Sequence, residues 1–155
     1  MLIKQFLNQE ELTLLKSWDE YLNSPKNDST GYKCSYRVFD SSIEYIVNIR
    51  NKVLNLVDIN SKKELGIGDF VTEIEPGGWC GAHIDATSEG HRHIRGNILI
   101  EKPDHGGYIL IEEKQIIMGE GDLYIMEPST LHGVSTVTGN KMYKLISFGF
   151  LVPIK

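Results

Sequence analysis

From about residue 64 onward, the sequence is a series of short runs of β-branched and aromatic residues, separated by Gly, Pro and Asp. The runs are DFVTEI, HIRGNILI, GYILIEE, QIIM, DLYIM, HGVSTV and KLISFGFLV. The turns that punctuate them are GGW (77–79), DHGG (104–107), GEGD (119–122) and TGN (138–140). Short strands divided by turn signals at this spacing predict an all-β sandwich or barrel. We therefore expect a double-sheet jelly roll over about residues 64–153.

The first part of the chain, about residues 1–60, has a helical pattern. Asn8 followed by Glu11 matches a capping box, which predicts the start of a helix. Apolar residues then recur at helical spacing, and we expect them in the core: Leu12, Leu15, Trp18 and Leu22. After a loop over 24–31, a second helix is expected to begin near Ser41 or Ser42. Its apolar face comprises Ile46, Ile49, Val53 and Val57.

The chain shows no internal repeat and no interdomain linker, so we expect one domain over residues 1–155. This domain is mainly β, with the N-terminal helices packed on one sheet of the jelly roll. The net charge is -5 and no basic run is present, which argues against a dedicated nucleic-acid binder. No apolar stretch approaches the ~20 residues that a membrane span needs.

The N-terminal segment MLIKQFLNQEEL turns acidic too early for a signal peptide. The two cysteines, Cys34 and Cys80, lie far apart and fit no zinc spacing. These features predict a cytoplasmic protein with reduced thiols. Because Cys80 lies three residues before His83, it is also expected near the site described next.

Three residues form the candidate metal site. His83 and Asp85 are two positions apart, so on a strand both side chains point to the same face. An HxD pair alone is weak evidence, but His132 follows a later strand and turn and completes a set of two histidines and one carboxylate. Such a facial triad suits a non-haem Fe(II) oxygenase, because three adjacent coordination positions stay open. Zinc hydrolysis would tolerate the same ligands and needs one open position.

A cosubstrate with two carboxylates needs a cation for the end that is remote from the metal. Lys141 follows His132 across the TGN turn, at the start of the last long strand, and an antiparallel return would place it beside the metal. Lys144 is the competing candidate, on the opposite strand face, and a solvated lysine after a turn is the other reading of Lys141. His91 and His93 have the spacing of a second metal pair, but no carboxylate is left to complete it.

Three segments resemble the prolyl 4-hydroxylase-like branch of the Fe(II)/2-oxoglutarate-dependent dioxygenases. IEPGGWCGAHID (74–85) is similar to the segment of that branch that ends in HxD. DHGGYILIE (104–112) is similar to its "GG, then a strand" feature, and HGVSTVTGNK (132–141) to its ending in GNK. The segments occur in the same order as in the family and cover roughly residues 70–150.

The resemblance implies a double-stranded β-helix, the cupin-like form of the jelly roll, with His83, Asp85 and His132 as catalytic iron ligands. It implies that Lys141 binds the C5 carboxylate of 2-oxoglutarate and that Lys144 is an ordinary strand residue. The family often has an Arg and a polar residue facing the cavity on one strand, which here are Arg95 and Asn97. Fe(II), 2-oxoglutarate and O2 are then the expected cofactor and cosubstrates, with ascorbate as a reductant.

The sequence departs from the family pattern at two places. Ile74 stands where many members have Tyr, and Leu99 or Ile100 falls near a Tyr that commonly bonds the ketoacid. We therefore expect fewer hydroxyl groups around the cosubstrate. Trp79 and Tyr108 are candidates for the substrate entrance, although core packing is the favoured role of Trp79. The loop over 86–93 is a candidate lid, with an inert surface loop as the equal alternative.

The expected function is hydroxylation of an aliphatic C–H with release of succinate and CO2. Prolyl residues of a peptide or protein are the leading candidate substrate. A free amino acid, another protein side chain and a nucleobase are the other open substrates, and the acidic net charge argues against the nucleobase. The alternative is a cupin-type module that binds a metal or small ligand without oxidation. Because the imidazoles must be neutral to bind a metal, activity is expected to fall at acidic pH.

Overall fold

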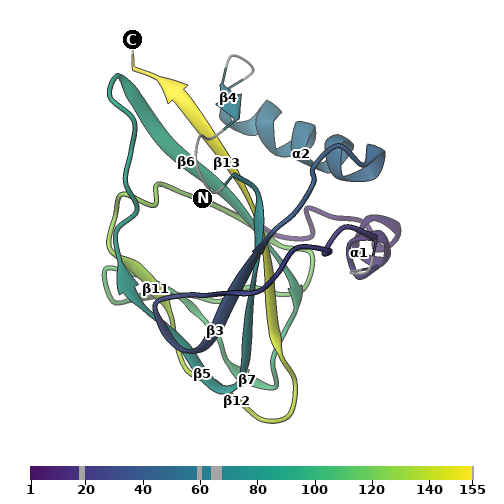
Figure 1. Ribbon diagram of the computed structural model, residues 1–155, viewed down its shortest axis with the longest axis vertical. Coiled ribbons are helices and arrows are strands. Elements are labelled where there is room, and N and C mark those ends of the chain that lie inside the picture. The colour runs from purple at the N-terminus through teal and green to yellow at the C-terminus, as the bar shows by residue number, and fades with distance from the viewer. Residues whose placement is uncertain (18–19, 59–60, 64–67, 155) are drawn as a thin grey trace.

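The computed structural model describes residues 1–17, 20–58, 61–63 and 68–154 and consists of a large curled antiparallel sheet with both helices on one side (Figure 1). The helices are α1 (Gln9–Leu15) and α2 (Glu44–Val57). Neither described helix is long and apolar enough to cross a membrane. The expected mainly β fold with helices packed on one sheet is confirmed.

The capping box that the sequence predicts begins α1. The Asn8 side chain accepts a hydrogen bond from the Glu11 amide, and the Glu11 carboxylate accepts one from the Asn8 amide. The helix ends at Leu15, earlier than the apolar pattern suggests, and Trp18 lies outside the described residues. The second helix begins at Glu44, slightly after the expected Ser41 or Ser42.

The apolar face of α2 packs toward the sheet. Ile46, Ile49 and Val53 are buried, as predicted, and Val57 packs partly buried against the same core. This core lies between the helices and the sheet, where Ile98, Ile146 and Phe148 complete it.

Thirteen strands are present among the described residues. They are β1 (Leu2–Ile3), β2 (Asn27–Asp28), β3 (Gly31–Val38), β4 (Lys62–Lys63), β5 (Phe70–His83), β6 (His91–Glu101), β7 (His105–Gly106), β8 (Ile109–Ile111), β9 (Lys114–Ile116), β10 (Leu123–Met126), β11 (His132–Val134), β12 (Val137–Thr138) and β13 (Tyr143–Pro153). The main sheet has the order β1-β10-β6-β13-β5-β11-β8-β9, and all its pairs are antiparallel. The strands β7 and β12 form a separate pair.

The strand β3 lies in the part of the chain for which the sequence predicts helices. It pairs with β5 over nearly its whole length, and it begins inside the segment 24–31 that was expected to be a loop. The helical interpretation missed β3 because its partner lies far along the chain, and strand pairing is not a local property. The preceding β2 pairs with β3 as a short hairpin.

The long strand β5 joins the two walls of the roll. Its first half pairs with β13, whereas its second half pairs with β11, as the pairs Ile74–Tyr143 and His83–His132 show. Between the halves, Gly77 has a φ of 89°, and a Cβ at Gly78 would lie 2.5 Å from the Tyr32 carbonyl oxygen. Glycine is therefore needed where the strand bends from one wall to the other.

The two faces of β6 separate the core from a cavity. Ile98 and Ile100 point to the helices, and Gly96 lets α2 approach, since a Cβ there would lie 2.4 Å from a methyl of Val53. The alternate residues Arg95 and Asn97 point the other way, into the roll. A second apolar cluster lies on this inner side, and it is the frame of the site described next.

Candidate metal centre and cavity

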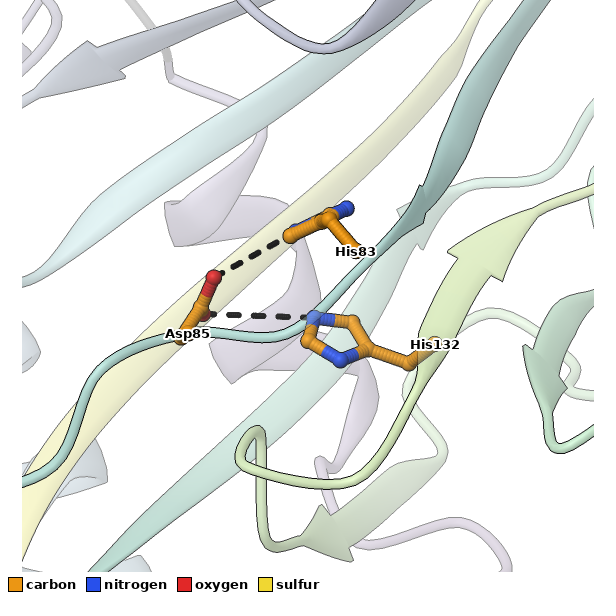
Figure 2. Close-up of side chains that lie close together, drawn as sticks. All are labelled: His83, Asp85 and His132. Atoms are coloured by element: carbon orange, nitrogen blue, oxygen red, sulfur yellow. Dashed lines mark ion pairs between the residues drawn. The ribbon is translucent and has the colours of Figure 1, made fainter.

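The structure brings His83, Asp85 and His132 together at one point (Figure 2). The two histidines are direct partners across β5 and β11, and their ring centroids lie 4.3 Å apart. The carboxylate of Asp85 faces both rings, with Oδ1 3.4 Å from Nε2 of His83 and Oδ2 3.9 Å from Nε2 of His132. One ligand atom from each residue lies within 4.8 Å of the others, as a bound metal ion requires.

Backbone carbonyl groups orient both imidazole rings. Nδ1 of His83 lies 2.7 Å from the Gly81 oxygen, and Nδ1 of His132 lies 2.7 Å from the Thr130 oxygen. Because a carbonyl only accepts, each Nδ1 must be the protonated nitrogen. A neutral ring then presents its Nε2 lone pair toward Asp85, which is the orientation that metal-binding histidines need.

The loop that carries Asp85 is held in the same way. Its amide donates to the Pro128 carbonyl oxygen at 2.9 Å, which ties the residue after β5 to the loop before β11. Burial lowers the pKa of His132 below its usual value, and the neighbouring His83 lowers it further. Two neutral imidazoles and one carboxylate on a common side form a donor set that fits a divalent first-row metal.

A cavity of about 550 Å³ opens beside these three residues. Its rim includes the exposed Ile84 and the segment Asp28–Thr30 before β3. Four buried lining residues belong to the inner apolar cluster, and we call them the floor: Cys80, Ile109, Val134 and Leu145. The cavity is therefore polar at the three candidate metal ligands and apolar at the floor.

Arg95 and Asn97 both line this cavity and are almost fully buried. The Arg95 guanidinium donates to the Gly68 carbonyl oxygen and to the Ser147 hydroxyl, and it lies 4.3 Å from the centre of the Phe70 ring. Among the described residues that line the cavity, Arg95 alone carries a positive charge. It is thus a second candidate partner for a ligand carboxylate.

The structure does not bring Lys141 to the cavity. This residue lies in the turn before β13 and is exposed; the hydrogen bond from the Asn140 amide lowers the pKa of Asp104, and the nearby charge of Lys141 lowers it further. Lys144 also lies outside the cavity, with Nζ 4.0 Å from the Glu101 carboxylate. A ligand contact of Lys141 would therefore require its side chain to turn inward.

Several side chains differ from their expected positions. Trp79 is 42% exposed and stacks on Tyr32, with ring centroids 5.1 Å apart, so its assignment to the core is wrong. It alternates along β5 with the inward-facing Cys80 and therefore points outward. Neither Trp79 nor the half-buried Tyr108 lines the cavity.

The remaining sequence candidates do not form a second site. His93 is buried and faces the Ala86 carbonyl oxygen, and His91 faces that of Glu89. Within the described part of the chain, His83, Asp85 and His132 are the one group of three potential ligands. The candidate lid is shorter than expected, because β6 already begins at His91 and Ala86 alone of its residues lines the cavity.

Two polar residues on other strands also line the cavity, Tyr36 and Thr72, and the buried Ser147 accepts a hydrogen bond from Arg95; the sequence motifs did not identify these three. The register explains their position, since Thr72 pairs with both Tyr36 and Leu145, and direct partners in antiparallel strands share a face. Alternation along β5 and β13 could have identified Thr72 and Ser147.

No protein-family model matches the sequence, and no curated protein matches it either. The structure, in contrast, is similar to solved oxygenases. A viral collagen prolyl hydroxylase from Paramecium bursaria Chlorella virus-1, in complex with 2-oxoglutarate, has a TM-score of 0.71 and 16% identity, and the match covers 98% of this chain and 95% of the other.

Two further solved structures have the same architecture. HygX from Streptomyces hygroscopicus, with nickel, 2-oxoglutarate and hygromycin B bound, has a TM-score of 0.72 and 10% identity over 98% of this chain and 82% of the other. A prolyl-4-hydroxylase from Pseudomonas putida has a TM-score of 0.67 and 12% identity over 99% of this chain and 92% of the other. The chain therefore has the double-stranded β-helix fold of the 2-oxoglutarate and Fe(II) oxygenases, including the prolyl hydroxylases.

Proposed function

We propose that this protein is an Fe(II)- and 2-oxoglutarate-dependent dioxygenase that hydroxylates an aliphatic C–H and releases succinate and CO2. The observation that carries the proposal is the convergence of His83, Asp85 and His132 beside a cavity inside this fold. In the proposal these three residues bind the iron. When bound, iron with 2-oxoglutarate and O2 supplies the oxidising chemistry, and ascorbate serves as a reductant.

The protein groups position the reactants and limit the access of water. The two Nε2 atoms are held toward Asp85 by the Gly81 and Thr130 carbonyl groups, so the donor atoms are oriented before a metal binds. The apolar floor leaves little hydration around a ligand that reaches it, which strengthens any charged contact there.

Two cations are candidates for the remote carboxylate of 2-oxoglutarate. Lys141 is our first choice, because the GNK triplet resembles the family motif and because the residue precedes β13 in phase with Leu145, which lines the cavity. Arg95 is the second, because it already lies in the cavity, with Asn97 as a polar neighbour. Both assignments are proposals that substitution can separate.

For the substrate we propose a prolyl residue in a peptide or protein. The similar structures include prolyl hydroxylases from a virus and from Pseudomonas putida, which supports this choice. HygX, with hygromycin B bound, has the same fold, so another small molecule or an amino acid is the competing kind of substrate. A cytoplasmic location stays a prediction, motivated by the two free cysteines.

The direct test measures succinate formed from 2-oxoglutarate by the purified protein with Fe(II), ascorbate and O2. We expect turnover by the wild type and none by His83→Ala. The control His105→Ala should have wild-type turnover, because His105 is exposed and lies on the separate β7–β12 pair. We also expect N-oxalylglycine with an inert divalent metal to raise the melting temperature.

The same measurements identify the alternative functions. If the protein neither consumes 2-oxoglutarate nor is stabilised by N-oxalylglycine, the oxygenase proposal is rejected. Metal binding without turnover would indicate a cupin-type binding module. Hydrolysis that zinc supports without O2 would indicate a metal hydrolase on the same ligands.

A further inference from the structure

A buried tyrosine in the inner apolar cluster has a hydroxyl group with no hydrogen-bond partner among the described residues. Tyr143 is the first residue of β13 and is 1% exposed, and its hydroxyl makes no hydrogen bond to any residue that the structure describes. Leaving a buried donor unsatisfied is costly, and such groups are rare in native proteins. Tyr143 does not itself line the cavity, but it packs against residues that do, so its orphaned hydroxyl indicates a ligand that reaches past them and accepts a hydrogen bond.

The position of Tyr143 links it to the floor of the cavity. Its side chain lies on the same face of β13 as Leu145 and packs in one cluster with Cys80, Ile109 and Val134, all of which line the cavity. Burial raises the pKa of Tyr143, and the nearby thiol of Cys80 adds to this effect. The phenol therefore stays protonated and available as a donor.

The strand register gives a second reason. Tyr143 pairs directly with Ile74 on β5, and Leu145 pairs with Leu99 on β6. Ile74 and Leu99 lie at or near the two positions where the sequence departs from the family by lacking a Tyr. One hydroxyl on the strand between β5 and β6 is thus available where two are missing.

We propose that Tyr143 is a cosubstrate-binding residue whose hydroxyl donates a hydrogen bond to the remote carboxylate of a 2-oxo diacid bound at the metal. This inference rests on the proposed function and assigns a residue to it. In this proposal the keto acid end of the diacid lies at His83, Asp85 and His132, and its other end lies at the floor. The described floor residues offer only a thiol and apolar groups, so a carboxylate there needs the donor that Tyr143 supplies.

The test is Tyr143→Phe, titrated with Mn(II) in place of iron so that no turnover occurs. The two probes are 2-oxoglutarate and 2-oxopentanoate, which has the same chain length but a methyl in place of the remote carboxylate. We expect the affinity for 2-oxoglutarate to fall about 10-fold or more, the size expected for a hydrogen bond to a charged group. The affinities for 2-oxopentanoate and for Mn(II) should not change.

The matched control is Tyr21→Phe. Tyr21 is also 1% exposed, but its hydroxyl donates to the Leu15 carbonyl oxygen in the cluster on the helix side. We expect this variant to have a lower melting temperature and unchanged binding of 2-oxoglutarate. Tyr143→Phe, which loses no protein hydrogen bond, should melt at or above the wild-type temperature in the absence of ligand.

The outcomes separate this inference from the proposed function. If the wild type binds 2-oxoglutarate and Tyr143→Phe binds it equally well, or loses both probes alike, the role of Tyr143 is overturned and the oxygenase proposal stands. If the wild type with Mn(II) binds neither 2-oxo acid, both proposals fail together.

Discussion

The two ends of the cavity are built to different degrees. At the metal end, pairing of β5 with β11 places His83 opposite His132, and backbone carbonyl groups hold both rings. Behind the floor, the Tyr143 hydroxyl lacks a partner among the described residues, and the candidate cation Lys141 is exposed outside the cavity. One end is thus complete without a ligand, whereas the other lacks contacts that a ligand would supply.

The difference follows from the lengths of the side chains and from the backbone elements that hold them. Short side chains on paired strands lose little freedom when they bind, so the backbone alone can orient them. Lys141 has a long side chain, but its turn is fixed: Asp104 accepts the Asn140 amide at 2.8 Å, and Gly139 has a φ of 99°. The backbone of Lys141 is therefore anchored, and binding needs a change of its side chain only.

The largest effect is expected at the metal end. Asp85→Asn keeps the shape of the side chain but removes the only anionic ligand of the triad. We expect the affinity for Mn(II) to fall by more than about 100-fold, because loss of a supporting outer group alone costs 10- to 100-fold. Equilibrium dialysis measures the affinity, with His105→Ala as the control. Retained Mn(II) binding would show that the triad is not the metal site.

A smaller loss is expected when the register of the two histidine strands is disturbed. A Cβ at Gly133 would lie 2.8 Å from the Cys80 carbonyl oxygen, so Gly133→Ala must push β11 away from β5 beside His132. We expect the affinity for Mn(II) to fall about 10-fold, within the range for lost ligand orientation. Gly119→Ala is the matched control, since its nearest neighbour is at 3.4 Å. Equal binding by both variants would mean that the strand pairing does not orient the site.

Much of the metal end could be predicted from the sequence because its determinants are local. The spacing of His83 and Asp85 on a strand predicts that both side chains lie on one face. The start of α1 could be predicted for the same reason, because the capping box of Asn8 and Glu11 depends only on neighbouring residues. The side chain of His132 could be matched to them because only one later histidine follows a strand and turn.

The other features depend on contacts between distant segments. The strand β3 forms against β5, and Trp79 points outward because the bend at Gly77 and Gly78 sets the phase of the following residues. The unpartnered hydroxyl of Tyr143 is invisible in the sequence, since it is defined by what its three-dimensional surroundings lack. Sequence patterns thus identify residues that can bind a metal more readily than they identify buried polar groups that lack a hydrogen-bond partner.

Substitution of two lysines tests which cation binds the remote carboxylate of 2-oxoglutarate. Lys141→Met removes the charge and keeps most of the aliphatic stem, and we expect the affinity for 2-oxoglutarate with Mn(II) to fall about 10-fold. Binding of 2-oxopentanoate should not change. Lys144→Met is the matched control, because Lys144 lies beside Glu101 outside the cavity. If neither variant loses affinity, Arg95 becomes the candidate that carries the charge.

The smallest effect is expected from exchanging Ile74 and Tyr143, which pair across β5 and β13 and pack in the same cluster as the floor. Ile74→Tyr alone adds volume next to Tyr143 in a fully buried position, so it should destabilise the protein by about 1–3 kcal/mol. The double variant Ile74→Tyr/Tyr143→Ile conserves the combined volume and moves the hydroxyl to the opposite strand. We expect its stability to lie within about 1.5 kcal/mol of the wild type, measured by urea unfolding.

The exchanged pair also tests what the floor contributes to binding. If a hydroxyl at this level of the cavity is what a remote carboxylate needs, the double variant should bind 2-oxoglutarate more tightly than Tyr143→Phe does, because it retains one donor. Binding as weak as that of Tyr143→Phe would mean that the geometry of β13, and not the hydroxyl alone, determines the contact. In that case the floor, like the metal end, would depend on strand register for its function.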